Sequence, residues 1–201
     1  MVYIEYISRR PGVELTDFQR VVNQVQECWQ SSYEADQLIL NAGRTWRLGE
    51  GPEYLGVWYS RDASFERLDD WEKAFRARTG TDDAVTMSRV ARIDFAGCYQ
   101  PLIMPRRARS GIYYLEKFRP RASDDDIRAL YEKRAREYRD SVLNLLVRGI
   151  GRLAPDPGGV AVWTIPNYAA LGAIVDFPNA ADLCVELTTA GVYVDIGREI
   201  L

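Results

Sequence analysis

Two stretches of sequence decide the fold of this 201-residue chain: VYIEYISRRP at 2–11 and IYYLEKFRP at 112–120. Each reads as a short apolar strand that carries one glutamate, ends in Arg and Pro, and leads into a helical pattern. A motif that recurs at the start of each half of a chain indicates an internal repeat. The chain is therefore predicted to contain two copies of one structural unit.

A long amphipathic helix is predicted after each of these strands. Apolar residues recur at three- and four-residue spacing from Phe18 to Trp29, and again from Ile127 to Leu146. Thr16 and Ser123 precede acidic residues at the two helix starts, which is the composition expected of N-terminal caps.

The remaining elements are predicted in the same order in both halves. The hairpin strands are expected at 44–48 with 54–60, and at 160–165 with 169–177; the second helices at 63–77 and 179–189; the closing strands at 90–97 and 192–197. The order β-α-β-β-α-β, repeated, predicts an α+β fold of two tandem ferredoxin-like units, residues 1–100 and 110–201. Packing the two open sheet faces together would form an intrachain barrel with outer helices and a cavity between the sheets.

Composition excludes several classes of function. The chain has no histidine, which removes the usual general base and the commonest metal ligand. A net charge of −3 with mixed signs gives no footprint for nucleic acid. No apolar run is long enough for a membrane span, and no leader pattern opens the chain, so a cytoplasmic location is expected. Three cysteines without CxxC spacing favour neither disulfides nor a thiolate metal site.

The sequence resembles the dimeric α+β barrel superfamily, most closely its NIPSNAP-like and EthD-like branches. The resemblance rests on Arg10-Pro11-Gly12 after the first strand, on a hairpin containing Gly43 and Trp46, and on Trp71 in the following helix. It implies the fold more firmly than a reaction, because members include monooxygenases, isomerases, decarboxylating lyases and haem enzymes. The haem-binding branches rely on a histidine that this chain lacks, and haem binding through Tyr or Cys has no support from spacing.

Strand alternation is used to orient the candidate catalytic residues. The more apolar side of the first strand is assigned to the helices, which would turn Glu5, and likewise Glu116, into the cavity. Tyr114 and, on the closing strand of the first half, Asp94 are expected beside them. Two carboxylates in a partly apolar cavity raise the pKa of at least one, which would create a general acid or base without histidine.

The alternative interpretation is structural. Glu5 would pair with Arg92 or Arg44, and Glu116 with a neighbouring basic group, because a buried charge needs a partner whether or not it reacts. For a ligand, the expected contacts are a flat aromatic lining with a few polar groups. The candidate binding residues are Tyr3, Arg44, Trp46, Trp58, Arg92 and Trp163.

The function expected from these residues is a cofactor-independent lyase, isomerase or oxygenase acting on a small aromatic or polyketide-like compound. Its alternative is a non-catalytic ligand-binding or assembly module of the NIPSNAP-like type. No cofactor and no metal are expected. The first half is the preferred location of the site, because it combines Glu5, Arg44, Trp46 and Asp94. The low charge of 169–187 predicts a buried surface and hence a homodimer.

Overall fold

The computed structural model describes residues 1–32, 36–49, 53–61, 66, 87–108, 111–154, 158–175 and 184–195. The strands of the first half are β1 (Val2–Arg9), β2 (Asp36–Gly49), β3 (Tyr54–Ser60) and β4 (Ala91–Ile103). Those of the second half are β5 (Ile112–Pro120), β6 (Val142–Gly149), β7 (Gly159–Ile165) and β8 (Val185–Asp195). The helices are α1 (Leu15–Ser32), α4 (Asp124–Glu137), α5 (Ala169–Val175) and the short 3-10 turn η1 (Gly151–Leu153).

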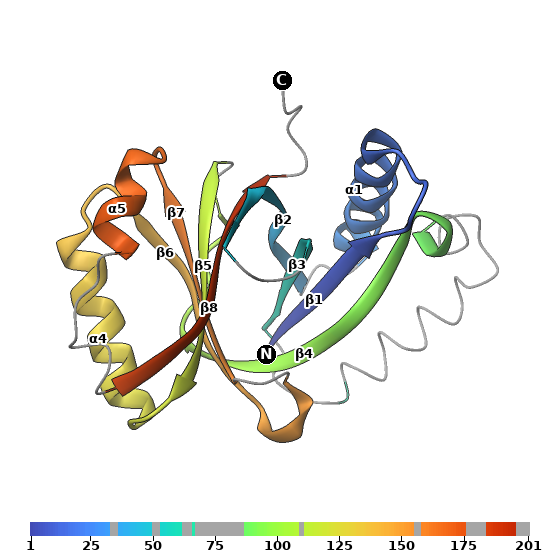
Figure 1. Ribbon diagram of the computed structural model, residues 1–201. Helices are drawn as coiled ribbons and strands as arrows, with labels where there is room; N and C mark the ends of the chain where they lie inside the picture. Colours follow the sequence, from blue (N-terminus) through green and yellow to red (C-terminus); the bar gives the residue numbers. More distant parts are fainter. Residues whose placement is uncertain are drawn as a thin grey trace.

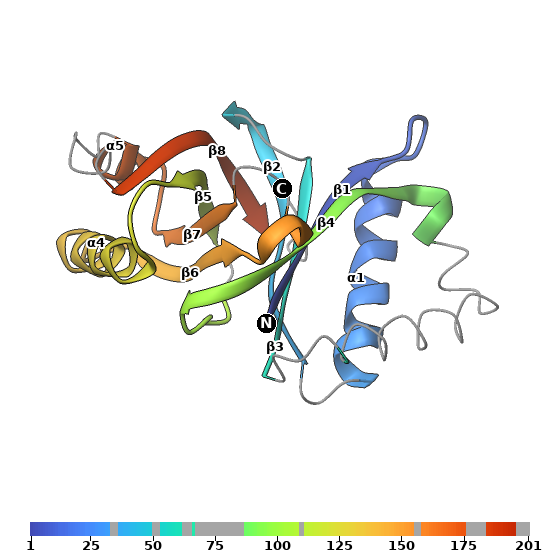
Figure 2. The same ribbon diagram turned by 90° about the horizontal axis from the view of Figure 1, so that it is seen from below.

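The strands form a closed antiparallel barrel in the order β1-β3-β2-β8-β5-β7-β6-β4. The two halves are joined where β2 pairs with β8 and where β4 pairs with β6. In both ribbon views α1 lies on one side of the barrel, and α4 and α5 lie on the opposite side (Figures 1 and 2). The predicted α+β class and barrel are confirmed. Within the ranges given above, no helix has a stretch long and apolar enough to cross a bilayer.

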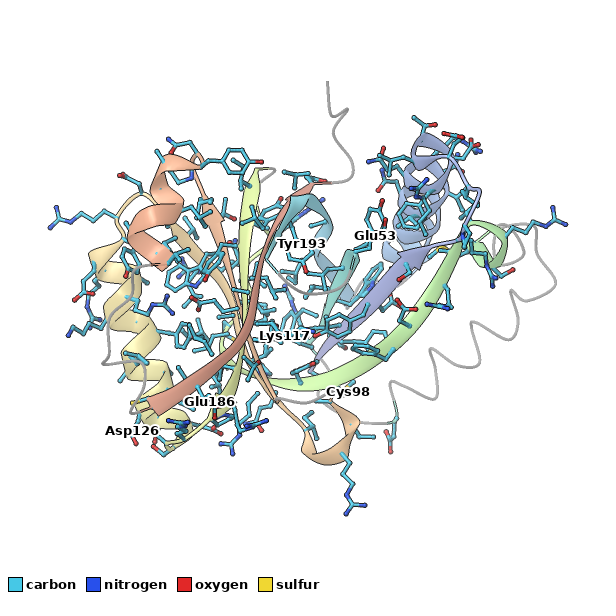
Figure 3. All side chains as sticks on the ribbon, in the orientation of Figure 1. Glu53, Cys98, Lys117, Asp126, Glu186 and Tyr193 are labelled. Atoms are coloured by element: carbon cyan, nitrogen blue, oxygen red, sulfur yellow. The ribbon has the colours of Figure 1, made fainter. Side chains whose placement is uncertain are left out.

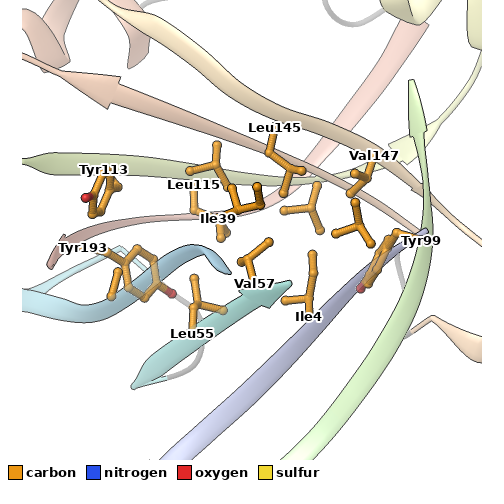
Figure 4. Packing of buried hydrophobic residues seen from close by; sticks show 14 of the residues in the cluster. Ile4, Ile39, Leu55, Val57, Tyr99, Tyr113, Leu115, Leu145, Val147 and Tyr193 are labelled. Carbon is orange, nitrogen blue, oxygen red and sulfur yellow. The ribbon is translucent and has the colours of Figure 1, made fainter. Parts of the chain in front are cut away.

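The barrel interior is a continuous apolar core. Side chains from both halves point toward one another between the strands (Figure 4). They include Ile4, Leu55, Val57 and Tyr99 from the first half and Tyr113, Leu115, Leu145, Val147 and Tyr193 from the second. Where a cavity was expected between the sheets, the described side chains pack against one another.

The predicted orientation of the first strand is wrong. Val2, Ile4 and Tyr6 belong to the interior core, so Tyr3 and Glu5 lie on the outer face of the sheet, toward the helices. The error has a physical reason: in a closed barrel with outer helices both faces of a strand are covered. Apolar content therefore does not tell which face meets the helices. In this strand the more apolar face lines the barrel interior, and the face toward the helices carries Tyr3 and Glu5.

The second half departs from the prediction between residues 137 and 177. The predicted helix to Leu146 ends at Glu137, where the Tyr138 amide donates to the Arg134 carbonyl oxygen at 2.9 Å, and the apolar run that follows is strand β6. Because β6 is buried on both faces, its sequence has no strand periodicity.

Two further elements of the second half differ. Residues 169–175, predicted as a strand, form α5, whose first turn is held by the Ala170 amide donating to Asn167 Oδ1 at 3.0 Å. The last strand, predicted from 192, begins at Val185, inside the predicted helix 179–189. The predicted helix 63–77 of the first half, apart from residue 66, lies outside the described residues.

Candidate functional site

Four residues on the outer face of the first sheet form what we call the first glutamate cluster: Tyr3, Glu5, Trp58 and Cys98. Tyr3 of β1 pairs with Trp58 of β3 on one side and with Cys98 of β4 on the other. Trp58 Nε1 donates a hydrogen bond to Glu5 Oε2 at 3.4 Å. Tyr3 and Glu5 are half-buried, and Trp58 and Cys98 are buried. The register of the sheet thus brings a phenol, a carboxyl, an indole and a thiol together.

Burial sets the protonation of this cluster. Desolvation raises the pKa of Glu5 to about 7, and the hydrogen bond from Trp58 offsets only part of that shift. The pKa of Tyr3 is raised, first by burial and then by the neighbouring Glu5 and Cys98. Desolvation also raises the pKa of the Cys98 thiol. Near neutral pH the phenol and the thiol are therefore protonated, while Glu5 is poised between its two forms.

The second half repeats the arrangement on β5 and β7, where Tyr114 pairs with Trp163 and Glu116 follows two residues later. Here the carboxylate is fully engaged: Arg134 Nη1 and Nη2 donate to its two oxygens at 2.8 and 2.7 Å, and Tyr131 Oη donates to Oε2 at 3.1 Å. The exposed fractions of the Glu116 and Arg134 side chains are 0% and 1%. The structural alternative therefore describes Glu116, which lies in a buried bidentate ion pair.

The helices beside the two clusters differ in sequence at one equivalent position. Phe18 of α1 and Ile127 of α4 are both fully buried at equivalent helical positions. Seven residues further on, the sequence of α4 has Arg134, whereas that of α1 has Val25, whose side chain has no hydrogen-bond donor. Among the described residues, no Lys or Arg forms an ion pair with Glu5, whereas Glu116 lies in a closed ion pair.

The remaining predicted residues do not join the first cluster. In the β1–β4 pairing Ala96, not Asp94, lies opposite Glu5, and Asp94 falls at the register shift between Tyr6 and Ile7. Asp94 instead accepts from Arg92 Nε at 2.6 Å and from Ser8 Oγ. Arg92 is 68% exposed, so it is a rim residue. Arg44 and Trp46 lie on β2, but their side chains fall outside the described set.

Sequence reasoning missed two charged residues of the interior layers. Arg134 lies within the apolar stripe of α4, and an arginine at such a position indicates a buried acidic partner. Lys117 follows Glu116 on β5 and points into the barrel, where it is buried against Tyr6. Correct orientation of β5 would have found Lys117, since alternation places it opposite to Glu116.

An antiparallel barrel of eight described strands with helices outside is the dimeric α+β barrel fold, and solved structures share it along the whole chain. A protein assigned as a monooxygenase from Lactobacillus acidophilus NCFM matches with a TM-score of 0.64 and 14% identity, covering 97% of this chain and 93% of that one. A haem-binding protein from Thermus thermophilus matches with a TM-score of 0.58 and 13% identity, covering 97% and 91%. Chlorite dismutase from Candidatus Nitrospira defluvii matches with a TM-score of 0.58 and 11% identity, covering 97% and 92%.

No protein-family model matches the sequence, and no curated protein matches it. At 11 to 14% identity the likeness to the solved structures establishes the fold alone. The names of these structures are a haem-binding protein, a monooxygenase and a chlorite dismutase. None of them supports a cofactor-independent lyase, isomerase or oxygenase, or a NIPSNAP-like module, so that expectation is wrong.

Proposed function

We propose that this protein binds haem, or a closely related iron porphyrin, at the first glutamate cluster, with Tyr3 as the ligand of the iron. The comparisons motivate haem as the ligand class, and the donor groups of the first glutamate cluster support it as the site. The single observation that carries the proposal is the placement of a half-buried phenol next to a carboxyl that has no ion pair among the described residues, on the outer sheet face.

The residue types present in the chain limit which side chain could be the axial ligand of the haem iron. With no histidine in the sequence, the axial haem ligands that remain are Tyr, Cys and Met. Among the described residues, no group of three His, Cys, Asp or Glu side chains could hold a bare metal ion. Tyr3 is preferred to its cross-strand partner Cys98 because Tyr3 is half-buried, whereas Cys98 is buried.

Glu5 would receive the proton that Tyr3 must lose to act as a ligand. A phenol whose pKa is raised ligates poorly unless a nearby base accepts its proton. Glu5, two residues along the same face, has a pKa of about 7 and is the base available there. Moving the proton from Tyr3 Oη to the Glu5 carboxylate leaves the total charge of the cluster unchanged, which avoids burying a second anion.

The shape of the outer face supports a planar ligand at the first cluster. Gly56 and Ala96 are the cross-strand neighbours of Glu5, so the sheet carries minimal side chains on both sides of the carboxyl. Trp58 adds an indole, which suits stacking against a macrocycle. Bound haem would supply redox and oxygen chemistry, and the chain would supply anchoring and proton storage.

Titration with haemin tests this proposal. The wild type is expected to shift the Soret band saturably at one haemin per chain. Tyr3→Phe should weaken binding at least tenfold and change the spectrum. Tyr114→Phe, the equivalent change in the second half, is the matched control and should leave both unchanged, because its glutamate is closed in an ion pair. A Tyr3→Phe protein with the wild-type spectrum and affinity would refute the proposal.

We further propose that residues 1–100 and 110–201 are two ferredoxin-like units, and that the chain forms a cytoplasmic homodimer. The order β4-β1-β3-β2 in the first half and β8-β5-β7-β6 in the second is the same order of equivalent strands, which supports the tandem arrangement. Among the described residues Cys98 and Cys184 are free thiols, as expected in a reducing compartment.

A further inference from the structure

A lysine is buried inside the barrel, away from both glutamate clusters. Lys117 of β5 is 8% exposed, and Figure 3 shows it between the two sides of the barrel. Its Nζ lies 4.0 Å from the centroid of the Tyr6 ring and 5.8 Å from that of Phe95. Across the described chain, no carboxylate forms an ion pair with it. Among the described residues, the partners of the amine are aromatic faces, which stabilise a full charge less well than water does.

The groups that face Lys117 from each neighbouring strand are neutral. Tyr6 of β1 faces it directly, and the Tyr6 hydroxyl lies 3.3 Å from that of Tyr99 on β4. Val160 of β7 and Thr189 of β8 are its cross-strand partners. Desolvation is the cause that lowers the pKa of Lys117 to about 8. A desolvated lysine of this kind is a nucleophile near neutral pH.

An unsatisfied hydroxyl lies on the cross-strand partner of this amine. Thr189 Oγ1 is buried and has no hydrogen-bond partner among the described residues. Buried polar groups in native proteins are nearly always hydrogen-bonded, so such a group requires an explanation. A bound oxygen atom near Lys117 would supply the missing acceptor. Phe95, whose ring centroid lies 5.8 Å from Lys117 Nζ, is 48% exposed, so an apolar side chain near the lysine is accessible to solvent.

We propose that Lys117 is a reactive amine that condenses with the carbonyl group of an apolar aldehyde at this end of the barrel. The Nζ lone pair attacks the carbonyl carbon, and the resulting carbinolamine loses its hydroxyl as water to leave an imine. The two hydrogens of that water come from the amine and the oxygen comes from the aldehyde, so no oxidant or reductant is needed. Thr189 Oγ1, on the cross-strand partner of Lys117, would donate a hydrogen bond to the carbonyl oxygen during the addition.

The chain contains a convenient internal control. Its lysines are Lys73, Lys117 and Lys133, and Lys133 on α4 is 65% exposed. An amine with a pKa near 8 is about half neutral at pH 8, whereas an ordinary solvated amine is about 0.4% neutral. Selective chemistry at Lys117 can therefore be measured against Lys133 within the same sample.

The experiment is reductive trapping with benzaldehyde and sodium cyanoborohydride, with benzylation of each lysine quantified by peptide mass spectrometry. At pH 8 we expect Lys117 to react at least tenfold faster than Lys133, with a rate that rises up to about pH 8 and then levels. Reaction at Lys117 no faster than at Lys133, or a rate that shows no inflection near pH 8, would overturn the proposal.

Two variants separate this site from the proposed haem site. Lys117→Arg keeps the positive charge but removes the nucleophile, so it should abolish trapping at position 117 while leaving haemin titration unchanged. Lys133→Arg should remove only its own labelling. Circular dichroism identical to that of the wild type establishes that Lys117→Arg is folded. Faster trapping at Lys117 together with failed haemin binding would support this site and refute the other.

Discussion

Glu5 and Glu116 occupy equivalent positions on β1 and β5, each two residues after a tyrosine that pairs with a tryptophan. Their described surroundings differ. Glu116 accepts two hydrogen bonds from Arg134 of α4, whereas among the described residues Glu5 accepts one from Trp58, at a longer distance. Equivalent positions thus hold a structural ion pair in one half and a titrating carboxyl in the other.

The protonation of Glu5 predicts a pH-dependent stability. The folded pKa of about 7 lies above the ordinary value of 4.5, so the folded state binds more protons between these pH values. The loss of folding stability caused by ionising Glu5 is absent below pH 4.5, grows as pH rises, and is complete above pH 7. Glu5→Gln should remove a cost on the order of 2–3 kcal/mol at pH 8 and little at pH 5. Urea unfolding of the wild type and of Glu5→Gln at the two pH values measures this difference in the free energy of unfolding. A difference that is the same at pH 5 and pH 8 would contradict the prediction.

The opposite result is expected at the second cluster. Arg134→Met leaves the fully buried Glu116 carboxylate unpaired, which should cost about 3–5 kcal/mol of stability. The double variant Glu116→Gln with Arg134→Met should recover part of that loss, because no buried charge remains. Thermal unfolding followed by circular dichroism measures both. Equal stabilities of wild type and Arg134→Met would show that the pair is not closed in solution.

At the scale of the elements, the helices fix what the strands can do. α4 begins at a defined cap, in which Ser123 Oγ accepts a hydrogen bond from the Asp126 amide at 3.2 Å. This cap sets the helical phase that delivers Tyr131 and Arg134 to Glu116. The start of α4 and the ion pair between Glu116 and Arg134 are therefore linked through one helix.

Loss of this cap gives a prediction for α4. Ser123→Ala should destabilise the protein by about 1 kcal/mol, and Ser123→Asn, which keeps a capping oxygen, should restore most of it. The expected fall in Tm is about 2–4 °C for a chain of this length. Differential scanning calorimetry of the three proteins compares them. A Ser123→Ala protein as stable as the wild type would show that the cap contributes nothing.

The sequence predicted β1, β3, β5 and the position of α1, because these segments have clear periodicity or a repeated motif. It could not separate α4 from β6, since the apolar run after Glu137 is buried on both faces and has no period. The candidate residues Tyr3, Glu5 and Trp58 were found, but their side of the sheet was not. Both faces of β1 are covered in the closed barrel, so apolar content alone could not choose between them.

At the scale of the whole molecule, the second half leaves several apolar side chains exposed around α5 and β8. α5 buries only Ile174 among its residues, and the exposed fractions of Tyr168, Val175 and Leu187 are 42%, 54% and 43%. Exposed apolar side chains on neighbouring elements are a feature of many interfaces. This surface lies in the second half, which favours contact between second halves of two chains.

The proposed homodimer follows from that surface. Light scattering should give twice the mass of one chain, and Val175→Asp combined with Leu187→Asp should give a monomer with unchanged circular dichroism. Arg92→Asp, a charge change on the exposed rim of the first half, is the control and should remain dimeric. A wild type that elutes as a monomer at all concentrations would contradict the proposal.

The most direct test of the account is the resonance Raman spectrum of the haemin complex. If Tyr3 ligates the iron and Glu5 holds its proton, the wild type should show ring vibrations of an iron-bound tyrosinate, and Tyr3→Phe should lose them while Tyr114→Phe keeps them. A complex without tyrosinate bands, or with bands that persist in Tyr3→Phe, would contradict the central claim that the first glutamate cluster is the haem site.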